Sequence, residues 1–126
     1  MISEGEEVKR IQGYRDLIIW QRAMEVVVEV YKYVGKLPKM EVYGLSDQMR
    51  RAAVSIPSNI AEGHDRYSTK EYIQYLSIAR CSKAELETQL LLCVQLGYLN
   101  DEDIRPAMQK LEEIGRMIIA ISRKLK

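Results

Sequence analysis

The chain has 126 residues with a formal net charge of +1, and 47% of its residues are hydrophobic. This composition excludes wholesale disorder, and the balance of charge excludes a global field that would draw the chain to nucleic acid or to a membrane. Any such binding must come from a local patch or from assembly. A chain of this length is expected to form one domain around one hydrophobic core.

The first thirteen residues lack hydrophobic periodicity, which predicts a flexible tail over residues 1–13 and one domain over residues 14–126. This opening stretch is acidic and polar, unlike a signal peptide, and no apolar run approaches the roughly 20 residues of a membrane span. Cys81 and Cys93 lie too far apart on one predicted helix to form a disulfide with each other. We therefore expect a cytoplasmic protein with reduced thiols.

The first predicted helix, from about Asp16 to Val34, is apolar over more than half of its circumference. The stripe expected to face the core comprises Leu17, Trp20, Met24, Val27, Tyr31 and Val34. A second stripe beside it comprises Ile19, Ala23, Val26, Val30 and Tyr33. This second stripe indicates either a wide buried sector or a subunit interface, and we expect it to lie between subunits of a closed ring.

The second predicted helix runs from Leu45 to Gly63 and contains Pro57. A proline inside a helix removes one backbone donor and crowds the carbonyl four residues back, so we expect a kink there. The hydroxyls of Ser55 and Ser58 and the amide of Asn59 are expected to be available to satisfy the freed carbonyl. Gly63 is expected to end the helix as a left-handed cap.

The third helix is predicted over about residues 69–96, with Gly97 at its end. Its start shows a capping box and a hydrophobic staple, which are the pairs Ser68–Glu71 and Tyr67–Tyr72. Asn100 is expected to cap a fourth helix. These elements predict an all-α fold, an antiparallel up-down-up-down four-helix bundle in which the second helix is kinked at Pro57.

Several motifs along the chain are shared with one known family. They are YRDL with Trp20 (residues 14–20), RRAAVSIP (50–57), NIAEG (59–63), SIAR (77–80), AELETQL (84–90) and GYL (97–99). In this order they resemble the bacterial four-helix-bundle family of 23S rRNA intervening-sequence proteins, which includes the accessory variability protein of diversity-generating retroelements. The resemblance implies a homo-oligomeric ring, a pentamer, that binds nucleic acid. It also implies RNA or an RNA–DNA hybrid, and a reverse transcriptase, as partners.

The residues that catalysis or metal binding would need are few. His64 is the only histidine, and no Glu-x-x-His pair of the kind that holds metals in helical bundles is present. Glu62 and Glu85 are candidate inward carboxylates. They could form an acid/base pair, but we favour a structural role in anchoring the backbone or an arginine. We therefore expect no enzyme activity, no metal and no cofactor.

The remaining candidates for function are basic residues. The nucleic-acid-binding residues predicted to line one surface of the assembled ring are Arg50, Arg51, Arg66, Lys70, Arg80 and Lys83. Arginine suits this role because its planar fork donates two parallel hydrogen bonds to a phosphate. The sequence thus favours a non-enzymatic nucleic-acid-binding adaptor, with RNA the expected ligand. The alternative is a protein-interaction scaffold whose basic residues form salt bridges.

Overall fold

The computed structural model describes residues 13–126, so the predicted tail lies, apart from Gly13, outside the described residues. Within this range the chain forms four long α-helices and no strand. The helices are α2 (Ile18–Val34), α3 (Leu45–His64), α4 (Thr69–Gln95) and α5 (Asp101–Leu125). Two short 3-10 turns, η1 (Tyr14–Asp16) and η2 (Lys39–Glu41), precede α2 and α3. The predicted all-α four-helix fold is confirmed.

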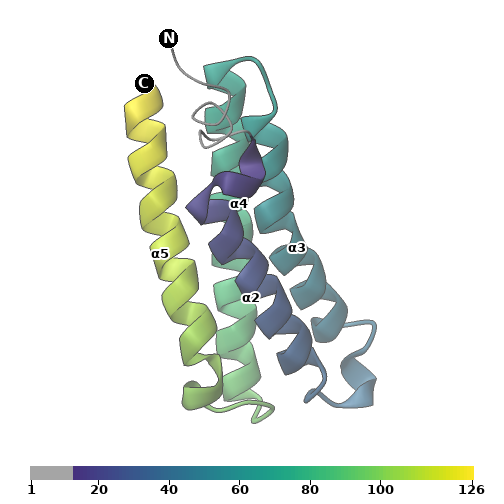
Figure 1. Ribbon diagram of the computed structural model, residues 1–126. Helices are drawn as coiled ribbons and strands as arrows, with labels where there is room; N and C mark the ends of the chain where they lie inside the picture. The colour runs from purple at the N-terminus through teal and green to yellow at the C-terminus, as the bar shows by residue number, and fades with distance from the viewer. Residues whose placement is uncertain (1–12) are drawn as a thin grey trace.

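The four helices lie side by side, and the chain reverses direction at each connection in Figure 1. Each helix packs against two others: α2 and α4 both contact α3 and α5. The core lies along the centre of this arrangement and is built from apolar side chains of every helix. The bend predicted at Pro57 stays a prediction. No helix among residues 13–126 is long and apolar enough to span a membrane.

The stripe of α2 that faces the core is not the predicted one. Val26 and Val30 are fully buried inside the protomer, whereas Met24 and Tyr31 are 41% and 51% exposed. The prediction is wrong because the second stripe is the one buried in the core, whereas the first lies at the edge of the core. Of the first stripe, Leu17, Trp20, Val27 and Val34 are partly buried against the core, and only Met24 and Tyr31 are exposed. Val26 and Val30 therefore cannot form a subunit interface, and the apolar side chains that α2 leaves exposed are those of Ile18, Met24, Val28 and Tyr31.

Pro57 is buried inside α3, and the polar side chains around it join α3 to α4. Asn59 Nδ2 donates to the Ser55 carbonyl at 2.8 Å and to Ser55 Oγ at 2.9 Å. Ser55 Oγ in turn lies 2.8 Å from Ser82 Oγ on α4. The Asn59 amide thus serves Ser55 and not the Ala53 carbonyl that Pro57 leaves without its usual donor, so this part of the prediction is wrong.

Gly63 does not cap α3 as predicted. The helix continues to His64, and the capping residue is Asp65 in a right-handed conformation. A Cβ at Gly63 would lie 2.5 Å from the Cβ of Tyr75, so the glycine is needed for the close approach of α4. Gly97 does occupy the left-handed region, with φ of 80°, directly after Leu96, the C-cap of α4.

The predicted caps Ser68 and Asn100 are both present, but the capping box predicted for Ser68 and Glu71 forms only in part, because the Glu71 carboxylate pairs with Arg66. Ser68 Oγ accepts a hydrogen bond from the Glu71 backbone N–H at 3.3 Å. Asn100 and Asp103 form a reciprocal capping box at the start of α5, with distances of 2.9 and 3.0 Å. Tyr67, however, is fully exposed, so the hydrophobic staple predicted with Tyr72 does not form.

Candidate functional site

Arg50 and Arg51 lie at the start of α3, on the side of the bundle where α3 meets α2. They line a shallow hollow with Tyr31 and Val54. Arg51 Nε is 3.1 Å from Asp47 Oδ2, so its charge is already paired. Neither arginine contacts Glu62 or Glu85, and both of these carboxylates are exposed. The predicted inward role of the two acids is therefore wrong.

Arg66 lies in the turn between α3 and α4, with Tyr75 and acidic neighbours around it. Its Nη2 donates to the Tyr75 hydroxyl at 2.7 Å, and its guanidinium lies 5.2 Å from the centre of the Tyr75 ring. Glu71 is 3.6 Å away, and Glu62 and Asp65 line the same hollow. Three carboxylates and one guanidinium thus line this hollow, and its excess of negative charge disfavours phosphate.

Lys70 and Lys83 also lie apart from each other. Lys70 is exposed in the first turn of α4. Lys83 is half-buried, its Nζ pairs with Glu87 at 3.0 Å, and its methylenes lie across Gly115 of α5. Lys83 therefore packs between two helices and cannot line a surface. Within one protomer the six predicted residues do not share a face, and their contact with nucleic acid stays a prediction.

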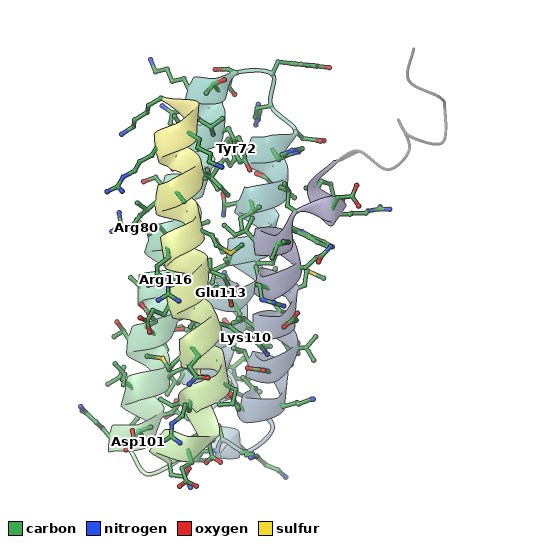
Figure 2. The ribbon with its side chains drawn as sticks, turned by 60° about the vertical axis from the view of Figure 1, so that its left-hand side comes forward. Tyr72, Arg80, Asp101, Lys110, Glu113 and Arg116 are labelled. Atoms are coloured by element: carbon green, nitrogen blue, oxygen red, sulfur yellow. The ribbon has the colours of Figure 1, made fainter. Side chains whose placement is uncertain are left out.

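Arg80 is the predicted residue that lies in a cationic groove. The groove runs between α4 and the last turns of α5 and has a volume of about 280 Å³. We call it the α4–α5 groove; it is lined by Ile73, Ser77, Arg80, Ile118, Ile119, Ser122, Arg123 and Lys126. In Figure 2, Arg80 lies on one side of α5, whereas Lys110 and Glu113 lie on the other.

The charge of the α4–α5 groove comes from three cations on two helices. Arg80, Arg123 and Lys126 have no ion pair within the part of the chain that the structure describes, and no Asp or Glu side chain lines the groove there. Sequence reasoning missed Arg123 and Lys126, because basic residues in a last helical turn also complement the helix dipole. Their spacing of three residues, which places them on one side of α5, was the available signal.

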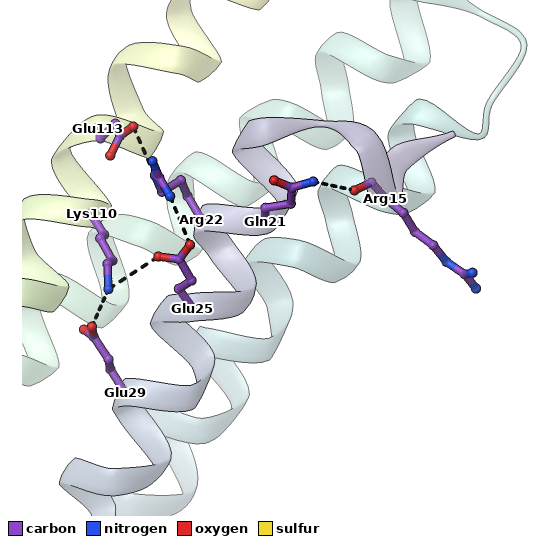
Figure 3. Close-up of polar contacts among 7 residues, drawn as sticks. All are labelled: Arg15, Gln21, Arg22, Glu25, Glu29, Lys110 and Glu113. Carbon is purple, nitrogen blue, oxygen red and sulfur yellow. Dashed lines mark hydrogen bonds and ion pairs between the residues drawn. The ribbon is translucent and has the colours of Figure 1, made fainter. Parts of the chain in front are cut away.

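Cations on the opposite side of α5 are paired. Arg22 contacts Glu25 at 3.0 Å and Glu113 at 3.3 Å, and Lys110 lies between Glu25 and Glu29 (Figure 3). We call these five residues the α2–α5 seam. The hydrogen bond to Glu29 raises the pKa of the Lys110 ammonium, which keeps it charged. The seam joins the first long helix to the last and leaves no cation for a ligand.

The residues weighed for metal binding and catalysis do not come together. The imidazole of His64 packs edge-on against Tyr72, 5.6 Å between ring centres. Its buried Nδ1 has no hydrogen-bond partner among residues 13–126. Over the same residues, no three His, Cys, Asp or Glu side chains come close enough to hold a metal ion. The absence of enzyme activity remains a prediction.

Comparison with known proteins gives a family and a structural neighbour. The family model described as 23S rRNA-intervening sequence protein matches residues 15–120. The fold is similar to that of a protein of unknown function from the S23 ribosomal protein family of Bacteroides thetaiotaomicron. The TM-score is 0.77 at 24% sequence identity, over 83% of this chain and 98% of that chain. At this identity the likeness shows the fold alone. No curated protein matches the chain.

Proposed function

This chain belongs to the family of 23S rRNA-intervening sequence proteins, and from that premise we propose that it is a non-enzymatic RNA-binding protein. The α4–α5 groove is the surface proposed to hold the RNA. The observation that carries the proposal is the presence of Arg80, Arg123 and Lys126 in one groove without a carboxylate side chain among its described lining residues.

A phosphate backbone is the ligand that suits such a groove. Cations already paired with carboxylates, such as Arg51 with Asp47, would have to lose that partner before binding a phosphate. Arg80 and Arg123 have no such partner in the described chain, and a guanidinium can donate two parallel hydrogen bonds to phosphate oxygens. Binding would release counterions from the RNA, which favours association at low salt.

Assembly would strengthen this binding. With a net charge of +1, one protomer offers a small cationic area and no wider attraction. A closed ring, proposed as a pentamer, would repeat the groove once per subunit, and linked grooves bind one RNA far more tightly than single grooves. The proposed subunit contact uses the apolar side chains that α2 leaves exposed, Met24, Val28 and Tyr31, in place of the buried Val26 and Val30.

The test is RNA binding by fluorescence anisotropy over a range of salt concentrations, with charge reversal in the groove. Arg80→Glu is expected to lower affinity at least tenfold and to reduce the slope of log K against log salt by about 0.7 to 0.9 for each phosphate that the variant no longer neutralises. Arg51→Glu is the matched control. It makes the same charge change on exposed α3 surface, away from the groove, where Arg51 pairs with Asp47. Equal effects of the two variants would refute the proposal.

The alternative function is a protein-interaction scaffold. It is favoured by the connection between α2 and α3, where Met40 and Tyr43 are 82% and 94% exposed. Exposed apolar side chains in one loop are typical of protein contacts. A scaffold would bind its partner with little dependence on salt, and its affinity for RNA would be the same with and without Arg80→Glu. The salt titration therefore separates the two functions.

A further inference from the structure

The surface between the cations of the α4–α5 groove is partly apolar and partly polar. Ile73 on α4 and Ile118 and Ile119 on α5 form it, together with the hydroxyls of Ser77 and Ser122. Ile118 is buried and belongs to the core, whereas Ile73 and Ile119 are half-buried and reach the groove surface. Neither serine hydroxyl has a hydrogen-bond partner among the described residues. A ligand that presents only phosphates would make no apolar contact with these isoleucines.

The two forms of RNA would contact this surface differently. A duplex stacks its bases inside and presents phosphates and 2′-hydroxyls, so against isoleucine it would lose hydration without gaining an apolar contact. A single strand can turn the flat face of a base toward an apolar side chain while its phosphates meet cations at the rim. Base contacts of this kind tolerate sequence changes, because every base has such a face.

We infer that the α4–α5 groove is specific for single-stranded RNA, with one base packed on Ile73 and Ile119 and the flanking phosphates on Arg80 and Arg123. The inference rests on the proposed function and adds the form of the RNA to it. A groove of about 280 Å³ between two packed helices has room for a group of nucleotide size, whereas a duplex could reach only the cations at its rim. The free hydroxyls of Ser77 and Ser122 are available to the base edge or the 2′-hydroxyl.

The experiment compares two labelled RNAs of one sequence, an unstructured 12-mer and its blunt duplex, at several salt concentrations. The protein is expected to bind the single strand at least tenfold more tightly. Ile119→Ser should lower affinity for the single strand about fivefold, as expected for the loss of an apolar contact of about one methylene group, and leave duplex affinity unchanged. The salt slope for the single strand should stay constant, because every cation that meets a phosphate is still present.

The matched control is Ile121→Ser, the same change on α5 at a half-buried residue outside the groove. Ile73→Ser repeats the test from α4, and melting temperatures of all variants identify any that fail to fold. Equal affinity for the two RNAs, or equal weakening of both with Ile119→Ser, would overturn the inference and leave the proposed function standing. No binding of either RNA at low salt would overturn both.

Discussion

Gly63 provides a sharp test of how closely α3 and α4 pack. In Gly63→Ala the new methyl carbon would lie 2.5 Å from Tyr75 Cβ and 3.1 Å from Tyr72 Cδ1. Favourable contacts between carbon atoms begin near 3.5 Å, so the two helices must separate by about 1 Å. Tyr75 Cβ is bonded directly to the α4 backbone and cannot rotate away.

Two effects of opposite sign determine how much Gly63→Ala changes the free energy of unfolding. Replacing glycine by alanine inside a helix favours folding by about 1 kcal/mol, and less near a helix end such as this one. Overpacking a rigid interface costs about 1–3 kcal/mol. The expected net result for Gly63→Ala is a decrease of about 1–2 kcal/mol in the free energy of unfolding. For a domain of this size that corresponds to a fall in melting temperature of about 3–10 °C.

Gly115→Ala is the matched control. Thermal and urea unfolding are measured for both variants and for the unmodified chain. A Cβ at Gly115 would meet Lys83 Cε at 2.7 Å, but this atom lies near the end of a flexible side chain that can move aside. For Gly115→Ala the free energy of unfolding is expected to stay the same or to rise by up to about 1 kcal/mol. The reasoning would be refuted if Gly63→Ala were as stable as the unmodified chain, or if both variants were destabilised equally.

Three further predictions concern the core, the thiols and a cap. Val26→Glu places a carboxylate at a fully buried position, so helical circular dichroism should disappear; a folded monomer would contradict this. Burial raises the pKa of Cys93 to about 11, so a thiol reagent at pH 8 should modify only Cys81 in the folded chain and both after unfolding. Asn100→Ala should cost about 1 kcal/mol in urea unfolding because it removes the capping box, whereas an unchanged midpoint would count against the cap.

The helices and their starts could be predicted from the sequence because they depend on local chemistry. The capping residues Ser68 and Asn100 act on backbone groups three residues away, so short patterns reveal them. Gly97 at the end of α4 is likewise a local signal. The family resemblance supported the same fold, and the structure confirms the four helices.

Which side chains of a helix point toward its neighbours could not be predicted in the same way. Apolar residues cover more than half of α2, so periodicity alone does not choose between a stripe containing Val26 and one containing Met24. Gly63 is typical of a helix end in sequence, but here a neighbouring tyrosine requires it. Arg66 and Arg80 look equivalent along the chain, and only the fold surrounds one with carboxylates and leaves the other without them.

The α2–α5 seam joins the parts of the bundle that are farthest apart in the chain. Arg22 and Glu113 are separated by 91 positions, and Lys110 and Glu29 by 81, whereas the other packed helix pairs are consecutive. Closing such a long loop costs chain entropy before any contact is made, so we expect neighbouring helices to pair first and the seam to close late in folding. Contacts that form after the transition state act mainly on the unfolding rate. We therefore expect the charges of the seam to act on how fast the bundle opens, with little effect on how fast it forms.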